Sequence, residues 1–366
     1  MKFNFKYIAI LIIINCQLLI INSANAQTDS SKLPLSFSGY IEGYYSYNIN
    51  RPEAHTAPGF IYSYNKADEF AINLGYVKAS YQTENVRANL AFATGTYMSA
   101  NYAAESSVFK NVLEADAGIK ISKKNNLWID AGVMPSHIGF ESAVGKDNWN
   151  LSRSMLADNS PYFETGTRIS YTSKNTEWYI SVLLLNGWQR IEMTDGNNTP
   201  SFGHQITFKP NEKLTLNSSS FIGNDKPDSA RQWRFFHDFY IQYQMSKIWG
   251  FIAGFDIGAQ QKSKGSSSYN CWYSPIIVGK INISDKSAIA FRAEYYRDKN
   301  SVIINTATPN GFQTFGYSFN YDLKINSNVL WRIEARELTS KDKIFLDNTT
   351  PKKNDLFFTT SLSVSF

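Results

Sequence analysis

The sequence of 366 residues is poor in cysteine and, after its first segment, in long apolar runs. Only Cys16 and Cys271 occur, too few for the disulfide framework of a small secreted scaffold. Beyond residue 26 no stretch stays apolar over the roughly eighteen residues that a membrane-spanning helix needs. Lysine and arginine form no cluster, and the formal net charge is only +5, so we expect no nucleic-acid partner.

Side chains that hold metals or nucleotides are also scarce. Histidine occurs at four scattered positions: His55, His137, His204 and His237. His137 and Glu141 are four residues apart, but side chains at that spacing converge only on a helix, and a strand and a loop are expected here. The segment from Gly139 to Lys146 departs from a phosphate-binding loop, because five residues rather than four separate its glycines. We therefore expect no metal site, no cofactor and no catalytic residues.

The first residues have the pattern of a secretory signal peptide. Two lysines precede an apolar run at residues 7–21, and an A-x-A cleavage site ends at Ala26. A membrane anchor is the alternative, but the run is shorter than a spanning helix and is interrupted by polar residues. We expect residues 1–26 to be removed on export, leaving a short periplasmic segment at residues 27–34. Two lysines are lost with the peptide, so the formal net charge falls from +5 to +3.

The rest of the chain alternates apolar and polar residues with a period of two. In the last nine residues, Phe358, Leu362 and Phe366 fall on one side of an extended backbone, and Ser361 and Ser363 on the other. Period two indicates a β-strand, because successive side chains point to opposite faces. Sixteen such segments are predicted, at residues 35–49, 70–83, 85–99, 109–122, 127–140, 161–173, 176–188, 201–209, 213–223, 233–245, 248–260, 271–282, 287–298, 312–325, 329–338 and 355–366.

The connections between these segments alternate in length. Seven are short polar turns such as PNEK and NSN, and the others are mostly longer loops, such as residues 50–69, 141–160 and 299–311. This is the plan of a transmembrane β-barrel. A soluble β-sandwich is the alternative, but it does not predict strands of this length. We predict an all-β, up-and-down antiparallel barrel at residues 35–366, whose last strand pairs with the first because a sheet in a bilayer can leave no open edge.

Charged residues in the predicted strands share the polar face. Arg or Lys on the lipid face would cost about 2–4 kcal/mol at mid-membrane, so these faces are expected to point inward. Both signs occur among the residues predicted to line the interior, so no ion preference follows: Glu42, Arg87, Glu114, Asp116, Asp130, Arg168, Arg234, Asp238, Asp256, Arg292, Glu294, Arg332, Glu334 and Arg336. Strand 70–83 does not fit, because Lys78 shares the phase of Ile72 and Leu74. Sixteen strands leave an aqueous channel unless a loop or domain plugs it, and no residues are spare for a plug, because the first strand starts near Leu35.

Several segments carry a family resemblance. These are GYIEGYYSYNINRP near the start, the block from Trp128 to Tyr171, LLNGWQR at residues 184–190 and the terminal Phe366. Together they resemble the OmpL-like putative β-barrel porins, the porin-2 family of Bacteroidetes-type outer membranes, over nearly the whole exported chain. The resemblance implies a diffusion channel in a bacterial outer membrane. It also implies that the barrel-assembly machinery recognises Phe366 in the last strand. The family offers no established substrate and no catalytic residues to transfer.

The loop at residues 141–160 joins the fifth and sixth predicted strands. By analogy with general sixteen-stranded porins, it would fold inward and narrow the pore. The residues expected at such a constriction are Glu141, Lys146, Asp147, Trp149, Arg153 and Asp158. A loop that caps the outer rim is the alternative.

The leading hypothesis is a passive channel for small polar solutes or ions, without enzyme activity. An outer-membrane barrel enzyme of the lipase or protease type is one alternative, although no Ser/His or Asp/His set stands out. An adhesion or structural barrel with a closed lumen is the other. The expected partners are outer-membrane lipid, the assembly machinery and small polar solutes, and association between copies of the chain stays open.

Overall fold

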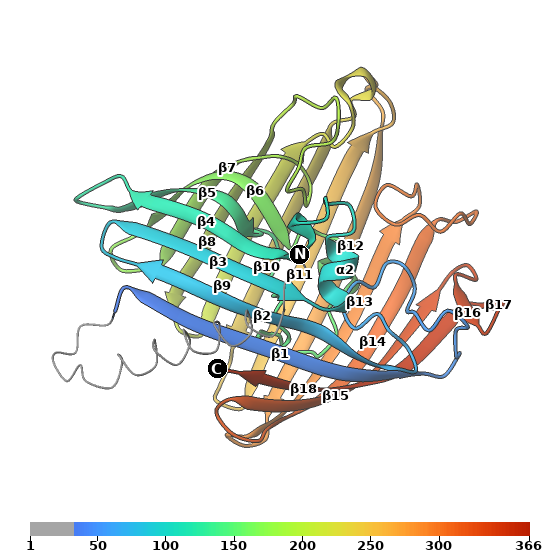
Figure 1. Ribbon diagram of the computed structural model, residues 1–366. Helices are drawn as coiled ribbons and strands as arrows, with labels where there is room; N and C mark the ends of the chain where they lie inside the picture. The colour runs from blue at the N-terminus through green and yellow to red at the C-terminus, as the bar shows by residue number, and fades with distance from the viewer. Residues whose placement is uncertain (1–32) are drawn as a thin grey trace, which may run out of the picture. The chain divides into compact units, whose positions relative to one another are not determined.

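The described part of the chain is a closed β-barrel (Figure 1). The computed structural model describes residues 33–366, so the predicted signal peptide and residues 27–32 lie outside it. Sixteen antiparallel strands form the wall: β1 (Leu35–Asn48), β2 (Phe70–Gln82), β3 (Val86–Thr94), β4 (Val112–Lys120), β5 (Asn126–Pro135), β6 (Phe163–Thr172), β7 (Trp178–Leu185), β8 (Ser201–Asn211), β9 (Leu214–Gly223), β10 (Arg234–Gln244), β11 (Trp249–Gln261), β12 (Tyr269–Asn282), β13 (Ser287–Asp298), β14 (Phe312–Lys324), β15 (Val329–Ser340) and β18 (Asn354–Ser365). Strand β18 pairs with β1 and closes the ring. The predicted fold class is confirmed.

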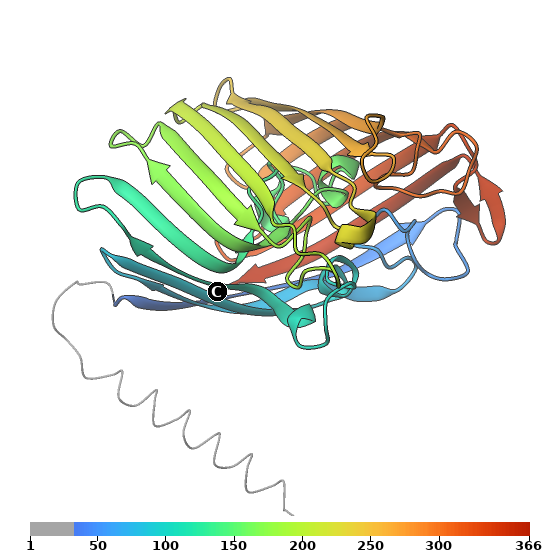
Figure 2. The same cartoon turned by 90° about the horizontal axis from the view of Figure 1, so that it is seen from above.

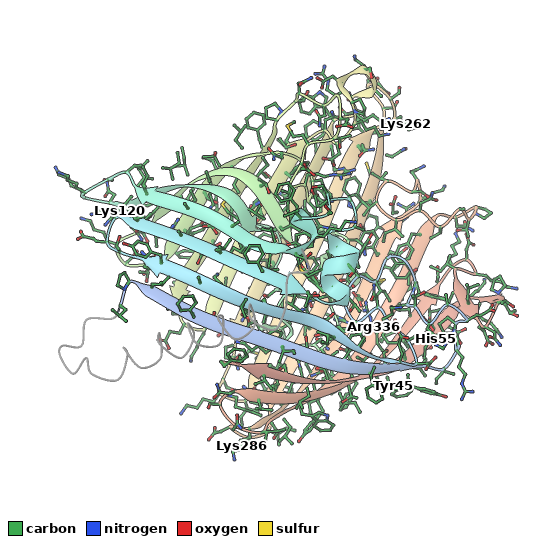
Figure 3. All side chains as sticks on the ribbon, viewed as in Figure 1. Tyr45, His55, Lys120, Lys262, Lys286 and Arg336 are labelled. Atoms are coloured by element: carbon green, nitrogen blue, oxygen red, sulfur yellow. The ribbon has the colours of Figure 1, made fainter. Side chains whose placement is uncertain are left out.

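Short turns join strands at one end of the barrel and long connections join them at the other. Figure 3 shows Lys120 and Lys286 at the short-turn end, and His55 and Lys262 at the opposite end. The long connections are named L1 to L8 in chain order. They contain α2 (Thr96–Asn101), η1 (Phe109–Asn111), η2 (Gly145–Asp147), α3 (Met155–Asp158), η3 (Asp228–Ala230) and the hairpin of β16 (Phe345–Asp347) and β17 (Thr350–Lys352). Within residues 33–366, every helix is too short or too polar to cross a membrane.

Several predicted strands are longer than the observed ones, and two of them run well past the observed carboxyl end. The segment predicted at 85–99 ends as β3 at Thr94, and α2 follows it. Gly95 causes the turn: its φ of 127° suits glycine, and a Cβ there would lie 2.3 Å from the carbonyl oxygen of Asn73. The segment predicted at 127–140 ends as β5 at Pro135. In both cases the alternation continued by chance into a loop.

The two faces of the wall differ as the alternation predicts. In β18, Phe358, Leu362 and the following Phe366 are exposed on the outer surface, whereas Ser361 and Ser363 are buried inside. The same division recurs around the ring, with large apolar side chains outside and polar or charged ones inside. An apolar outer surface and a polar inner surface suit a barrel that spans a bilayer.

Strand β2 contains a β-bulge that explains the phase of Lys78. Glu42 of β1 pairs with Leu74 and the next residue, Gly43, pairs with Ile72, so Asn73 is an extra residue. Ile72 points outward, but after the bulge Leu74 is fully buried inside. Lys78 therefore faces the interior, where its Nζ pairs with Glu114 at 2.5 Å.

The ring closes over a glycine in β1. The backbone amide of Gly39 donates to the carbonyl oxygen of Phe366 at 2.7 Å, and the Phe366 amide donates back at 3.0 Å. A Cβ on Gly39 would lie 2.4 Å from two ring carbons of Phe366, so the aromatic ring rests directly on the glycine. The seam, where the first strand pairs with the last, therefore requires glycine at position 39, because a side chain there would collide with the Phe366 ring.

We expect Gly39→Leu to weaken closure of the barrel. The new side chain has to displace the Phe366 ring, and overpacking of this kind costs about 1–3 kcal/mol. The folded fraction can be measured from the mobility of unheated and heated samples on denaturing gels. Gly279→Leu is the matched control, because a Cβ at Gly279 meets nothing within 4 Å. Equal folded fractions for the two variants would contradict the seam's role.

Candidate functional site

The long connection L3, residues 136–162, enters the barrel and crosses its interior (Figure 2). It leaves the wall between β5 and β6 but binds β15, and five strands separate β5 from β15 by the shorter way around the ring. The guanidinium of Arg332 on β15 donates to three L3 carbonyl oxygens, those of Gly145 at 2.8 Å, Asn148 at 3.0 Å and Trp149 at 3.1 Å. Arg332 also pairs with Asp322 of β14 at 2.6 Å.

Further contacts hold L3 against the same part of the wall. Arg336 pairs with Glu294 at 2.7 Å, and Arg292 pairs with Glu334 at 3.2 Å. Glu334 accepts from the amide and hydroxyl of Ser152, at 2.6 and 2.9 Å. We call Arg292, Glu294, Arg332, Glu334 and Arg336 the arginine–glutamate cluster; all five are buried. Because each buried charge has an opposite charge or a loop carbonyl beside it, the cluster and L3 compensate each other's desolvation.

The first part of L3 is held by the other side of the barrel. His137 Nδ1 lies 2.7 Å from Glu164 of β6, and its Nε2 lies 2.8 Å from the carbonyl oxygen of Ser220 in β9. The hydroxyl of Ser219 donates to the His137 carbonyl at 2.8 Å. Both ring nitrogens are thus engaged, and residues 33–366 contain no group of three His, Cys, Asp or Glu side chains arranged to bind a metal ion.

L1, residues 49–69, also reaches the interior. The Tyr64 hydroxyl donates to Glu42 of β1 at 2.8 Å, and the Asn73 side chain at the bulge donates to the same oxygen at 3.2 Å. A Cβ on Gly145 of L3 would lie 2.5 Å from both the Glu42 carboxylate and the Tyr64 hydroxyl. Glycine is therefore required where the two loops meet the wall.

Apolar side chains pack together in the long-loop half of the lumen. Wall residues that point inward near the ends of their strands pack on residues of L1, L3, L7 (299–311) and L8 (341–353). The wall contributes Leu183, Leu185, Phe221, Phe236, Trp272, Tyr296, Phe312, Leu338 and Phe357, and the loops contribute Phe60, Ile61, Ile138, Met155, Ile304 and Phe345. The prediction that no residues were spare for a plug is wrong, because the long loops themselves supply one.

Open space remains beside the plug. A cavity of about 420 Å³ lies between L3 and the wall of β2 and β4, lined by Tyr76, Lys78 and Glu114 on the wall side and by Phe140 and Glu141 on the loop side. A second cavity, of about 900 Å³, lies among L1, L7 and L8 at the long-loop end. Space between L3 and the wall of β2 and β4, with L3 fixed to β13 and β15, resembles a constriction rather than a complete seal.

A family profile described as "Putative beta-barrel porin-2, OmpL-like" matches residues 34–366. The chain belongs to this family. The match covers every strand of the porin barrel, so the resemblance seen in the sequence is confirmed at the level of the family. A search of curated proteins with this chain found no match.

Solved porin structures share the fold at low sequence identity. The anion-selective porin from Comamonas acidovorans is 6% identical, with a TM-score of 0.59 over 91% of this chain and 99% of that one. OmpT of Vibrio cholerae, in its trimer form, is 9% identical, with a TM-score of 0.59 over 91% and 99%. The outer membrane channel DcaP of Acinetobacter baumannii is 11% identical, with a TM-score of 0.56 over 91% and 97%. At these identities the likeness shows the fold alone.

The structure gathers the residues predicted to line the porin's interior into several groups. One group is the arginine–glutamate cluster of β13 and β15, which contacts L3: Arg292, Glu294, Arg332, Glu334 and Arg336. Arg87 and Arg168 both pair with Asp130, at 2.6 and 3.3 Å. Glu114 pairs with Lys78, and Asp116 accepts from Asn89 at 3.4 Å. Asp238 and Asp256 lie opposite each other in β10 and β11. Arg234 pairs with Asp225 at 2.8 Å near the long-loop end, and Glu42 lies apart, beside Tyr64.

The predicted constriction residues of L3 have different environments. Lys146 and Asp147 are exposed and pair with each other at 3.1 Å. Glu141 accepts from Ser154 and Trp149 lies under Lys280, with 5.7 Å between its ring and Nζ. Arg153 is buried and donates to loop carbonyls, and Asp158 is buried beside Ser63 of L1. Of the six, Lys146 and Asp147 are exposed, Glu141 and Trp149 are partly buried, and Arg153 and Asp158 are buried.

Several interior residues were not identified from the sequence. Asp322 shares the polar phase of β14 with Asn320, so alternation would have found it. Lys78 was obscured by the bulge, which reverses the faces of β2 at Asn73. Tyr64 lies in L1, where no periodic pattern marks an inward side chain.

Protonation of Asp158 is expected to stabilise L3 in its position inside the barrel. Burial raises the pKa of Asp158 from its ordinary 3.8 to about 7, although the charges of Arg336 and Arg153 oppose the rise. Because the pKa is higher in the folded state, this stabilisation is complete below the unfolded pKa and is lost as pH rises through about 7.

We expect the thermal unfolding midpoint of the protein in detergent to fall as pH rises from about 5 to about 8. The fall should be smaller in Asp158→Asn, which stays neutral throughout. Circular dichroism at a series of pH values measures both midpoints. Parallel curves for the two proteins would contradict a titration of Asp158 in this range.

Proposed function

We propose that the protein is an outer-membrane channel through which small polar solutes or ions diffuse passively, without enzyme activity. The main support is a closed sixteen-strand barrel with an apolar outer surface and a polar inner wall, in which an inward loop fills only part of the lumen. A polar wall lowers the cost of moving hydrated solutes across a bilayer, and no energy coupling is needed. Family membership supports the same function.

In this proposal L3 forms the constriction, and solutes pass between L3 and the wall of β2 and β4. The cavity of about 420 Å³ marks the narrow part of the route. Lys78 and Glu114 carry opposite charges there and are paired at 2.5 Å. The predicted interior residues toward the short-turn end, including Arg87, Asp130 and Arg168, would line the wider vestibule.

A closed structural or adhesion barrel is the second candidate, and the apolar packing of the long loops favours it. Purified protein in a planar bilayer distinguishes the two. The channel proposal predicts steady ion conductance in discrete steps, without hydrolysis of ester or peptide substrates. Absence of steps from protein that is folded by gel mobility would reject the channel and leave the closed barrel.

Export and assembly complete the proposal. Residues 1–26 would act as the signal peptide, with cleavage after Ala26, and residues 27–34 would lie in the periplasm. The last strand, ending at Phe366, would be recognised by the barrel-assembly machinery. We also propose that copies of the chain associate in the membrane; OmpT of Vibrio cholerae, which shares the fold, is described in a trimer form.

A further inference from the structure

A row of polar side chains crosses the outer face of three adjacent strands. His204 of β8 lies opposite Ser220 of β9, and Ser220 lies opposite His237 of β10. All three point outward, because their neighbours two residues along each strand, such as Phe202, Ile222 and Phe239, are exposed apolar residues. The row continues on either side as Val182 of β7 and Ile257 of β11, both exposed. The polar row is therefore surrounded by apolar surface.

The row lies at mid-height in the apolar belt. Ser220 is six residues beyond Leu214, where β9 begins after its short turn. At about 3.3 Å per residue and a tilt of about 40°, this places the row about 15 Å above the turn, within an apolar band about 25 Å tall. Imidazole and hydroxyl groups at this depth would face acyl chains, which offer no hydrogen bonds.

Contacts within the chain satisfy these groups only in part. His204 Nδ1 lies 2.5 Å from the Ser220 hydroxyl, and His237 Nε2 lies 3.4 Å from the Ser218 hydroxyl. The two imidazole rings are 6.1 Å apart between centroids. Across residues 33–366, no side chain or carbonyl is hydrogen-bonded to His204 Nε2 or His237 Nδ1. A metal ion does not account for them, because no third ligand of the usual types joins the pair in that part of the chain.

We propose that the outer face of β8, β9 and β10 is the surface through which two copies of this chain meet, with the His204–Ser220–His237 row of one copy against the row of the next. The inference rests on the proposed association of copies and adds the face that mediates it. A second copy suits the row because neutral histidine and serine each donate and accept, so identical rows facing each other can pair. Serine and histidine side chains also hydrogen-bond across the interfaces between transmembrane helices.

The test compares oligomeric mass in mild detergent for wild type and His204→Leu/His237→Leu. Leucine suits a lipid-facing wall, so the double variant should fold, and heat-dependent gel mobility checks this. We expect native mass spectrometry to show wild type as an oligomer and at least a tenfold loss of the oligomeric fraction in the variant. Phe291→Leu/Phe319→Leu, an exposed outer pair on β13 and β14 with ring centroids 5.1 Å apart, is the control and should keep the wild-type mass.

Cross-linking in native membranes provides the second measurement. With Cys271→Ser as background, a short thiol cross-linker should join copies that carry Ser220→Cys and not copies that carry Ala293→Cys, which points outward on β13. A wild type that is a single chain in detergent and gives no Ser220→Cys cross-links overturns the association itself. An oligomer that keeps its mass in the double variant overturns the assigned face. Single-channel steps, recorded separately, test the channel proposal whichever result is obtained.

Discussion

We expect deletion of residues 145–157 to increase single-channel conductance severalfold. The deleted segment supplies the loop atoms that Arg332 and Glu334 bind, so its removal takes most of L3 from the lumen. The wall residues left behind remain partly paired with each other, as Arg336 with Glu294 and Arg292 with Glu334. A wider water-filled bore then carries the current. Planar-bilayer recording of wild type and the deletion, at the same salt concentration, measures the change.

A second deletion controls for shortening a loop. Residues 263–267 lie in the connection between β11 and β12 and are mostly exposed, so their removal should leave conductance unchanged. If the 145–157 deletion folds and conducts no better than wild type, L3 is not the constriction. In that case the apolar packing among the other long loops would limit the current.

We expect Arg332→Leu to destabilise the barrel by about 3–5 kcal/mol, the usual cost of removing one partner from a buried ion pair. The substitution removes the charged donor of the Asp322 carboxylate and one hydrogen-bond donor of each of three L3 carbonyl groups. We also expect larger and noisier single-channel currents, because L3 loses its main contact with β15. Urea unfolding in detergent measures the free energy, and bilayer recording measures the currents.

Two control variants test whether the effect of Arg332→Leu comes from the hydrogen bonds that Arg332 makes to L3. Arg332→Lys keeps the positive charge but loses the planar fork of donors, so it should recover only part of the stability. Lys146→Ala removes an exposed member of L3 whose partner is Asp147, and exposed pairs contribute about 0–1 kcal/mol. A loss in Arg332→Leu no larger than in Lys146→Ala would mean that the arginine–glutamate cluster does not hold the loop.

The barrel was predictable from the sequence because every strand alternates apolar side chains that face lipid with polar side chains that face the lumen. Alternation and turn residues located all sixteen wall strands, and the charged residues of β13 and β15 were correctly expected on one face. The errors fell where one residue changes the local geometry. The bulge at Asn73 reversed the faces of β2, and Gly95 turned the end of predicted strand 85–99 into a loop and helix.

The interior could not be predicted in the same way. L3 was expected inside only by analogy, since nothing periodic in residues 136–162 tells where its carbonyl groups point. Its partners lie far away in sequence: 187 positions separate Gly145 from Arg332. The apolar plug was missed for a related reason. Phe60, Ile304 and Phe345 belong to runs of two or three apolar residues in otherwise polar loops, too short to show a period, and only the closed ring brings them together with the wall.

The same separation in sequence determines the order in which these contacts form during synthesis and folding. L3 is made early, yet the contacts that fix it join Met155 to Glu294, 139 positions later, and reach residues of β15 later still. Long-range contacts of this kind form late, because closing so large a span of chain costs entropy that only the finished ring repays. A partly inserted precursor would contain the arginines and glutamates of β13 and β15 without their L3 partners. We therefore expect a cell with reduced barrel-assembly activity to accumulate an intermediate in which L3 is not yet bound to these strands.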